Sequence, residues 1–157
     1  MGGQTIELWS TRLEGLNIPE IHIFDRDNEP PEPGKYQDFA DSVNARGEHC
    51  CALMTSKREM ENYLHHNAIN EALGTTLENI NPFDDVPTMV AQAIHENSES
   101  PNAWNELSDK KRDEKIRKAK KQLNRNVADL MTSELLHQSD VDGEVLIWLQ
   151  RIQQHLN

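Results

Sequence analysis

Residues 21–24 are a short, mostly apolar run that ends directly in an Asp-Arg-Asp sequence. Such a run is typical of a buried strand. The loop that follows, residues 28–34, includes three prolines and a glycine. Neither a strand nor a helix continues through such a loop, because proline lacks a backbone donor and fixes its φ angle. The strand is therefore predicted to end at Phe24, with two acids, Asp25 and Asp27, just beyond its carboxyl end.

Helical patterns alternate with this strand and with a second one. Apolar residues recur at helical spacing over residues 5–16 and again over residues 35–46. Residues 48–54 predict another strand. Residues 56–59 have the Ser-x-x-Glu pattern of a capping box, which predicts a helix over residues 56–73 with a glycine as its C-cap. This alternation predicts an α/β fold, in which a parallel sheet is flanked by helices.

The rest of the chain is predicted to be mainly helical. The expected elements are an acidic irregular stretch, a short helix, a flexible linker, a long charged helix and an amphipathic closing helix, at residues 75–86, 87–96, 97–102, 108–136 and 143–156. We therefore predict three parts. These are an α/β core over residues 1–75, an acidic variable insert and linker over 76–107, and a helical C-terminal region over 108–157.

The sequence contains no sign of a membrane span or a secretion signal. No apolar run approaches the roughly 18–20 residues that a helix needs to cross a bilayer. The first ten residues have neither the basic region nor the apolar core of a signal peptide. Cys50 and Cys51 are adjacent, a spacing at which a disulfide is strained, and we expect both to be reduced. These features predict a cytoplasmic protein that does not bind membranes.

The charge of the chain is unevenly distributed. The formal net charge is −11, yet residues 109–125 contain nine Lys and Arg against three Asp and Glu. The acidic remainder argues against nonspecific binding of nucleic acid by the whole chain. The basic segment fits a helix that faces phosphate beside a metal site. Its alternative interpretation is a solvated helix face, which is the usual one for a run of charges.

Asp25 and Asp27 are the first candidates for a metal site. In open parallel sheets, ligands bind beyond the carboxyl ends of the strands, where both side chains are expected. Two carboxylates so close together repel each other unless a cation lies between them, and oxygen ligands favour Mg²⁺ or Mn²⁺. The alternative interpretation is a pair of solvated loop acids, with Asp27 starting a turn.

Glu59 and Glu61 are further candidates, on the helix predicted to begin at Ser56. At helical spacing, Glu61 lies at the border of the apolar face and can reach toward the strand ends, whereas Glu59 lies well outside that face. The capping box is the better explanation of Glu59. For Glu61, the alternative is a weak surface pair with Lys57, one helical turn earlier.

Six motifs occur in a characteristic order. They are G-G-x-T at residues 2–5 before a helix with Trp9, L-x-x-P-x-x-x-x-x-D-R-D at 16–27, K-R-E-M-E-N-Y-L at 57–64, K-K-Q-L-N at 120–124, M-T-S-E-L-L at 131–136 and D-x-x-G-E-V-x-x-W-L at 140–149. Together they resemble the Toprim domain of nucleases of the overcoming-lysogenization-defect (OLD) type. Similar C-terminal sequences occur in ATPase–Toprim proteins of bacterial phage defence. The resemblance covers nearly the whole chain, with residues 75–107 poorly matched.

This resemblance implies a partial Toprim-like core and an endonuclease that depends on Mg²⁺ or Mn²⁺ and hydrolyses phosphodiester bonds in DNA. Asp25 and Asp27 would bind the metal. A glutamate of the K-R-E-M-E-N-Y-L motif would join them, with Glu61 as the better match and Glu59 as the alternative.

The resemblance also implies a lysine near the phosphate and a set of partners. The lysine would be Lys120 or Lys121. The partners would be DNA, an ATPase domain or partner subunit and, in a homo-oligomer, a second copy of the chain.

One feature of Toprim domains is missing from the sequence. Such a domain begins with a strand that ends in a glutamate before the Gly-Gly turn, and this sequence starts at that turn. Glu7 and Glu14 fall within the helix predicted over residues 5–16, so neither can replace that glutamate. We therefore expect activity to need an upstream ATPase and Toprim segment. The alternative function is a non-catalytic interaction module, and a piece of a Toprim primase or topoisomerase is a third interpretation.

Overall fold

Two parallel strands form the centre of the first part of the chain. β1 (Glu20–Phe24) and β2 (Cys50–Met54) pair along their whole length in the same direction. This computed structural model describes residues 18–156, with side chains as far as residue 154. The helix predicted over residues 5–16, with Trp9, and the motif before it lie outside the described residues.

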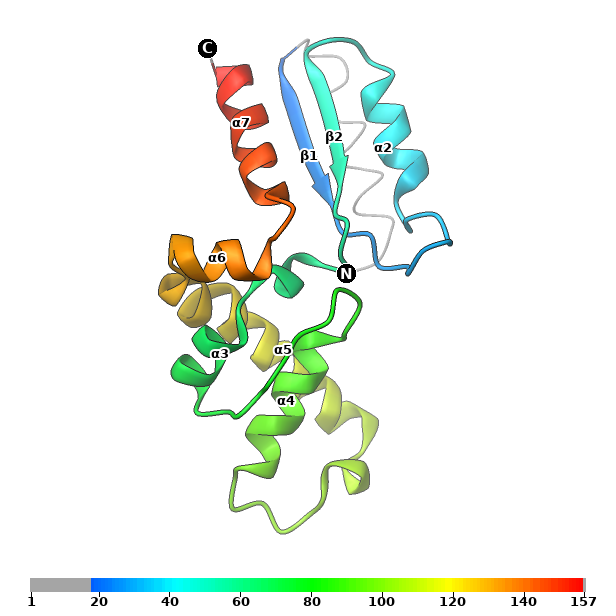
Figure 1. Ribbon diagram of the computed structural model, residues 1–157. Helices are drawn as coiled ribbons and strands as arrows, with labels where there is room; N and C mark the ends of the chain where they lie inside the picture. The colour runs from blue at the N-terminus through cyan, green and yellow to red at the C-terminus, as the bar shows by residue number, and fades with distance from the viewer. Residues whose placement is uncertain (1–17, 157) are drawn as a thin grey trace. The chain divides into compact units, whose positions relative to one another are not determined.

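The helix α2 (Gln37–Asn44) connects the two strands and packs against β2 (Figure 1). The hydrophobic core of this part is formed by Phe24, Ala40, Val43 and Ala52. Asn44 fixes the end of the helix on the sheet. Its Oδ1 accepts a hydrogen bond from the Ala52 N–H at 2.8 Å, and its Nδ2 donates to the Ala52 carbonyl at 3.1 Å. The strand–helix–strand order and the parallel sheet confirm the prediction from the sequence.

The closing helix α7 (Glu144–Leu156) belongs to the same compact unit as the two strands. Gly143 precedes it with a φ angle of 68°, in the left-handed region that glycine adopts without strain. The Glu144 carboxylate accepts hydrogen bonds from the Ser56 N–H at 3.0 Å and from the Ser56 hydroxyl at 2.6 Å. These bonds tie the first turn of α7 to the chain just beyond β2, and they explain why the predicted closing helix begins at this point.

A second compact unit, Lys57–Asp142, contains no strand among its regular elements. Its helices are α3 (His66–Leu73), α4 (Val86–Glu96), α5 (Asp109–Gln122) and α6 (Ser133–Ser139). Its buried core consists of Ala68, Ile69, Val86, Val90, Ala91, Ala119, Leu123 and Val127. Because α4 packs along α5, only one side of α5 is left for solvent or a ligand.

The helix predicted over residues 56–73 is wrong in its first half. Residues 57–59 form bends, Met60–Tyr63 forms a single 3₁₀ turn, and α3 begins only at His66. The predicted end is correct, because Gly74 stops α3 in the left-handed conformation.

Local polar side chains explain the missing half of that helix, because they offer the backbone other hydrogen bonds. The Ser56 hydroxyl donates a hydrogen bond to the Glu144 carboxylate, which is not part of the expected capping box. Asn62 accepts a hydrogen bond from the Glu59 N–H at 3.2 Å, so the cap is shifted along the chain. His65 then starts α3 anew, since its Nδ1 accepts from the Asn67 N–H at 3.1 Å.

The single helix predicted over residues 108–136 is also wrong. The structure ends α5 at Gln122 and continues with a π-helical turn, Leu123–Val127, and a 3₁₀ turn, Ala128–Leu130. A new helix, α6, then begins after Thr132, whose hydroxyl accepts a hydrogen bond at the N-cap. Threonine is a favoured N-cap residue, and a cap of this kind stabilises a new helix start by about 1 kcal/mol.

The described residues thus form an α/β protein in which helices predominate, with six α-helices and a two-stranded parallel sheet. One compact unit ends at Ser56 and resumes at Gly143, and the other lies between them. The boundaries predicted at residues 75 and 107 divide the chain by sequence character, whereas the compact units divide it by contacts. The predicted boundaries stay a prediction. None of the helices within residues 18–156 is long and apolar enough to cross a membrane.

Candidate functional site

The loop that carries Asp25 and Asp27 is tied to the ends of both strands. The fully buried Thr55, which follows β2, accepts a hydrogen bond from the Arg26 N–H at 2.8 Å through its hydroxyl. Its own N–H donates to the Phe24 carbonyl at 2.9 Å. The two aspartates are therefore half-buried and lie just beyond the carboxyl ends of the strands, where open parallel sheets bind their ligands.

A lysine of the same loop neutralises Asp27. The Lys35 ammonium lies 3.0 Å from Asp27 Oδ2, and the hydrogen bond to Asp27 raises the pKa of Lys35 above its ordinary value. Asp27 has a φ angle of 58°, a left-handed conformation that aspartate tolerates in turns. This geometry agrees with the interpretation of Asp27 as the start of a turn. Metal binding by Asp25 and Asp27 stays a prediction.

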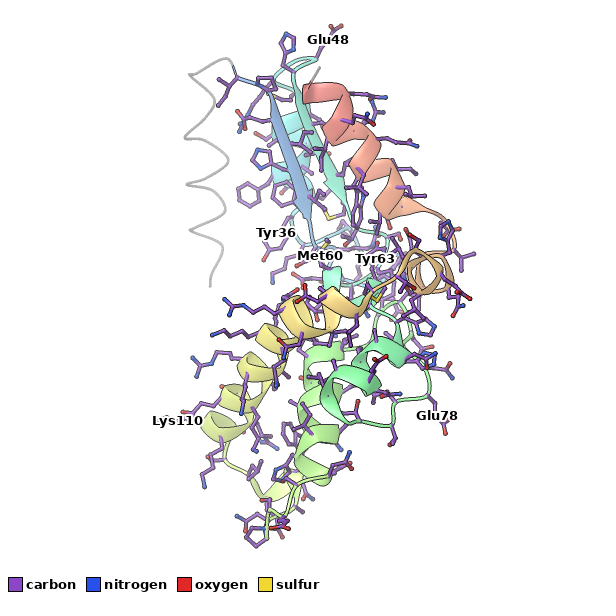
Figure 2. All side chains as sticks on the ribbon, turned by 90° about the vertical axis from the view of Figure 1, so that its left-hand side faces the viewer. Tyr36, Glu48, Met60, Tyr63, Glu78 and Lys110 are labelled. Atoms are coloured by element: carbon purple, nitrogen blue, oxygen red, sulfur yellow. The ribbon has the colours of Figure 1, made fainter. Side chains whose placement is uncertain are left out.

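A second group of site candidates meets at the 3₁₀ turn Met60–Tyr63, which Figure 2 shows with both end residues labelled. The Lys120 ammonium of α5 lies 2.8 Å from Glu59 Oε2 and 3.3 Å from Glu61 Oε1. The Asn124 side chain donates a hydrogen bond of 2.9 Å to the same Glu61 oxygen. One ammonium therefore bridges two carboxylates that are two positions apart in the sequence. We call Glu59, Glu61, Lys120 and Asn124 the glutamate–lysine cluster.

The backbone that carries Glu61 is fixed by buried polar side chains. The Asn62 amide donates to the Asn81 carbonyl at 3.0 Å and to the Asp84 carbonyl at 3.1 Å. The Ser139 hydroxyl donates to the Tyr63 carbonyl at 2.7 Å. These bonds connect the turn to two distant segments, and this order restricts where the Glu61 carboxylate can point.

The cluster differs from the surface pair that helical spacing suggested for Glu61. Its ion-pair partner is Lys120, whereas the Lys57 ammonium donates to the Asn62 carbonyl at 3.0 Å and lies over the Tyr63 ring. Pairing with Lys57 requires a continuous helix, but a 3₁₀ turn takes its place. Lys120 is distant in the sequence, so local spacing does not reveal it as the partner of Glu61.

Burial makes the charges in the cluster strongly dependent on each other. The Glu61 side chain is only 2% exposed and that of Glu59 is 11% exposed, whereas Lys120 is 45% exposed. Burial favours the neutral amine of Lys120, but the two carboxylates outweigh it and raise the pKa of Lys120 above its ordinary value. Such buried carboxylates need a cation, because an unpaired charge costs several kcal/mol in a protein interior.

The structure distinguishes the two lysines that the sequence left open. Lys120 contacts the glutamates, whereas the neighbouring Lys121 is exposed and has no ion pair among the described residues. Asn124 was not among the predicted site residues, although it is the last residue of the K-K-Q-L-N motif that contains Lys120. Asn124 lies in the π-helical turn Leu123–Val127, and π turns in α-helices occur frequently at functional sites.

The donor atoms of the cluster fit a hard divalent cation. Glu59 and Glu61 supply carboxylate oxygens, and the position between them is occupied by the Lys120 ammonium. Within residues 18–156, no group of three or more His, Cys, Asp and Glu side chains converges as a metal site. Two carboxylates are nevertheless a usual protein contribution to bound Mg²⁺, whose other ligands are waters and phosphate oxygens.

The structure brings Glu59, Glu61 and Lys120 together within one compact unit. Asp25 and Asp27 belong to the other unit. A metal site shared by the aspartates and the glutamates therefore stays a prediction. No family model matches this chain, and no significant match to it was found among curated proteins or solved structures. The resemblance to Toprim nucleases accordingly depends on the sequence motifs alone.

Proposed function

We infer that this chain carries part of the active site of a metal-dependent DNA endonuclease of the Toprim, OLD type, which hydrolyses phosphodiester bonds. The observation that carries this proposal is the Lys120 ammonium, which is shared by the carboxylates of Glu59 and Glu61. Both segments of this contact belong to motifs that resemble the same nuclease family. Lys120 and Glu61 are 59 positions apart in the sequence, and their contact supports the proposal that both belong to one site.

In this proposal, Asp25, Asp27 and Glu61 hold Mg²⁺ or Mn²⁺, and Glu59 is the alternative ligand. The bound metal supplies Lewis-acid stabilisation of the phosphate and an activated water. Lys120 stabilises negative charge that develops on the phosphate, as a positive group that can reach the reacting atoms.

DNA is the proposed substrate because α5 presents exposed cations that have no ion pair with the described residues 18–154. Figure 2 shows nitrogen-tipped side chains along this helix, starting at Lys110. Its exposed cations without an ion pair among the described residues are Lys110, Lys111, Arg117, Lys118 and Lys121. Contacts from Lys and Arg to phosphates supply most of the nonspecific affinity for DNA. The proposal also includes a cytoplasmic role in phage defence, with an ATPase domain or partner subunit.

The test is a calorimetric titration of the chain with Mg²⁺ and Mn²⁺. We expect binding by the wild type, loss of affinity in Glu61→Gln and in Asp25→Ala/Asp27→Ala, and unchanged binding in the control Glu78→Gln, which alters an exposed acid of the same unit as Glu61. A nuclease assay with Mg²⁺ or Mn²⁺ then measures cleavage of plasmid DNA by the wild type and by the same variants. A wild type that binds neither metal in this titration contradicts an autonomous metal site.

A second candidate function is a non-catalytic interaction module. It is favoured by α7, where Leu146, Ile147 and Leu149 are each more than two-fifths exposed although they are large and apolar. Exposed apolar side chains that adjoin one another are typical of binding surfaces. Metal distinguishes the two functions, because a module of this kind needs none and Asp25→Ala would leave its partner binding unchanged.

A further inference from the structure

We propose that Lys120 is the resident cation of the glutamate–lysine cluster, and that a divalent metal binds there by displacing its ammonium from Glu59 and Glu61. This inference rests on the proposed function and adds a description of the site before metal arrives. It also couples two events, because binding of metal releases the lysine that is proposed to contact the phosphate.

The first argument is that both cations need the same oxygen atoms. The ammonium is 2.8 Å from Glu59 Oε2 and 3.3 Å from Glu61 Oε1. A magnesium ion that binds these oxygens lies about 2.0–2.1 Å from each. An ammonium held by the same two atoms would be within a few ångströms of the metal, and like charges at that distance repel strongly. The two cations therefore exclude each other.

Lys120 can move into solvent, whereas the Glu61 carboxylate is held in place. Lys120 is 45% exposed, whereas Glu61 is 2% exposed and its backbone is held by the buried Asn62. A lysine side chain is a flexible four-carbon stem with a strongly hydrated ammonium, so it moves into water at little cost. The glutamates stay in position, and the exposed lysine is the group that exchanges.

The third argument concerns the state without metal. Two carboxylates with little exposure repel each other and lose hydration, and a single ammonium offsets both costs. Lys120 thus keeps the pair assembled before metal binds. Competition of this kind reduces the apparent affinity for metal, because the intrinsic affinity is multiplied by the fraction of time for which the pair is free of the lysine.

The pair of Lys35 and Asp27 is a natural comparison within the same chain. These side chains are 55% and 30% exposed, so water already competes for their contact. An exposed ion pair contributes little to the free energy that holds its two side chains together. We therefore expect removal of Lys35 to change metal affinity much less than removal of Lys120.

The experiment measures Mn²⁺ binding by calorimetry in the wild type, in Lys120→Met and in the control Lys115→Met, which alters a half-buried lysine of the same helix. We expect about tenfold tighter binding in Lys120→Met, no change in Lys115→Met, and loss of binding when Glu61→Gln is added to either. If Lys120→Met binds Mn²⁺ equally or more weakly than the wild type and binding still depends on Glu61, displacement of the lysine is overturned. The proposed metal site at Glu61 then stands without it. If neither the wild type nor Lys120→Met shows Mn²⁺ binding that depends on Glu61, the proposed function is overturned as well.

A second measurement uses the wild type and does not depend on the folding of a variant. Acylation of lysine amines is followed by mass spectrometry with and without Mg²⁺. Displacement predicts that Lys120 reacts several times faster when Mg²⁺ is present, while the reactivity of Lys118 is unchanged. Equal reactivity of Lys120 at saturating Mg²⁺ contradicts the exchange.

Discussion

The side chains of Asn124 and Glu61, 63 positions apart in the sequence, are joined by a hydrogen bond of 2.9 Å. Asn124 donates to Oε1, the Glu61 oxygen that also lies nearest to the Lys120 ammonium. A carboxylate that binds metal usually has such a partner, which fixes its orientation. The contact therefore assigns Asn124 a positioning role for Glu61 in the proposed metal site.

We expect Asn124→Ala to weaken Mn²⁺ binding by about tenfold, because removing a hydrogen bond to a ligating group typically reduces metal affinity by about 10- to 100-fold. Calorimetry measures the affinity. The matched control is Asn126→Ala, an exposed residue of the same π turn. Equal Mn²⁺ affinity in Asn124→Ala and Asn126→Ala would show that Asn124 does not position the metal ligand.

The sheet was predictable from the sequence because its signals are local. The apolar run that becomes β1 ends at a proline-rich loop, and the run that becomes β2 follows a helical pattern, so each boundary lies within a few residues of its cause. The two strands are joined by a long connection that contains one helix, and such a crossover returns the chain so that the second strand runs parallel to the first.

The glutamate–lysine cluster was only partly predictable because it depends on contacts between distant segments. The motifs offered Glu61, with Glu59 as the alternative, and either Lys120 or Lys121, but helical spacing gave the wrong conformation around Glu61. Asn62 bonds to carbonyl groups about 20 positions away, and no local pattern reports such a bond. Asn124 was missed for the same reason, since its partner lies on another element.

Thr55 is expected to hold the Asp25–Asp27 loop on the sheet. Thr55→Val keeps the shape of the side chain but removes the acceptor of the Arg26 N–H, a bond of 2.8 Å at a fully buried residue. Leaving a buried donor without this partner costs about 1–3 kcal/mol. Urea denaturation measures the free energy of unfolding, and amide exchange at Arg26 measures the local effect. Thr55→Ser retains the hydroxyl and is expected to keep the protection of that amide, so equal exchange in both variants contradicts the role of this bond.

His65 predicts a decrease in stability in weak acid. Its Nδ1 accepts the hydrogen bond that caps α3, which requires the unprotonated ring nitrogen. Burial, and then the neighbouring His66, lower the pKa of His65 below its ordinary value of 6.5. The unfolded chain therefore binds a proton more readily than the folded chain does. The stabilisation is fully present above about pH 6.5 and disappears as the pH falls toward the lower pKa of the folded state.

The measurement is the free energy of unfolding between pH 8 and pH 5, followed by circular dichroism in urea. His65→Asn keeps a side chain that caps helices but does not titrate, so its stability should fall less across this range. The control is His49→Asn, which alters an exposed histidine in the other compact unit. A parallel decline of wild type and His65→Asn contradicts the assignment to His65.

The last prediction concerns the exposed cations of α5 and their interaction with DNA. We expect the variant Lys110→Gln/Lys111→Gln/Lys118→Gln/Lys121→Gln to bind duplex DNA more weakly, because each of these side chains is exposed and can reach a phosphate. The dependence of affinity on salt should also fall, by roughly 0.9 in the logarithmic slope for each phosphate that the variant no longer neutralises. Fluorescence anisotropy over a range of salt concentrations measures both quantities. Replacement of the same four lysines by arginine keeps the charge and is expected to keep the slope. If the glutamine variant retains the affinity and the slope of the wild type, α5 is a solvated face and DNA binds elsewhere.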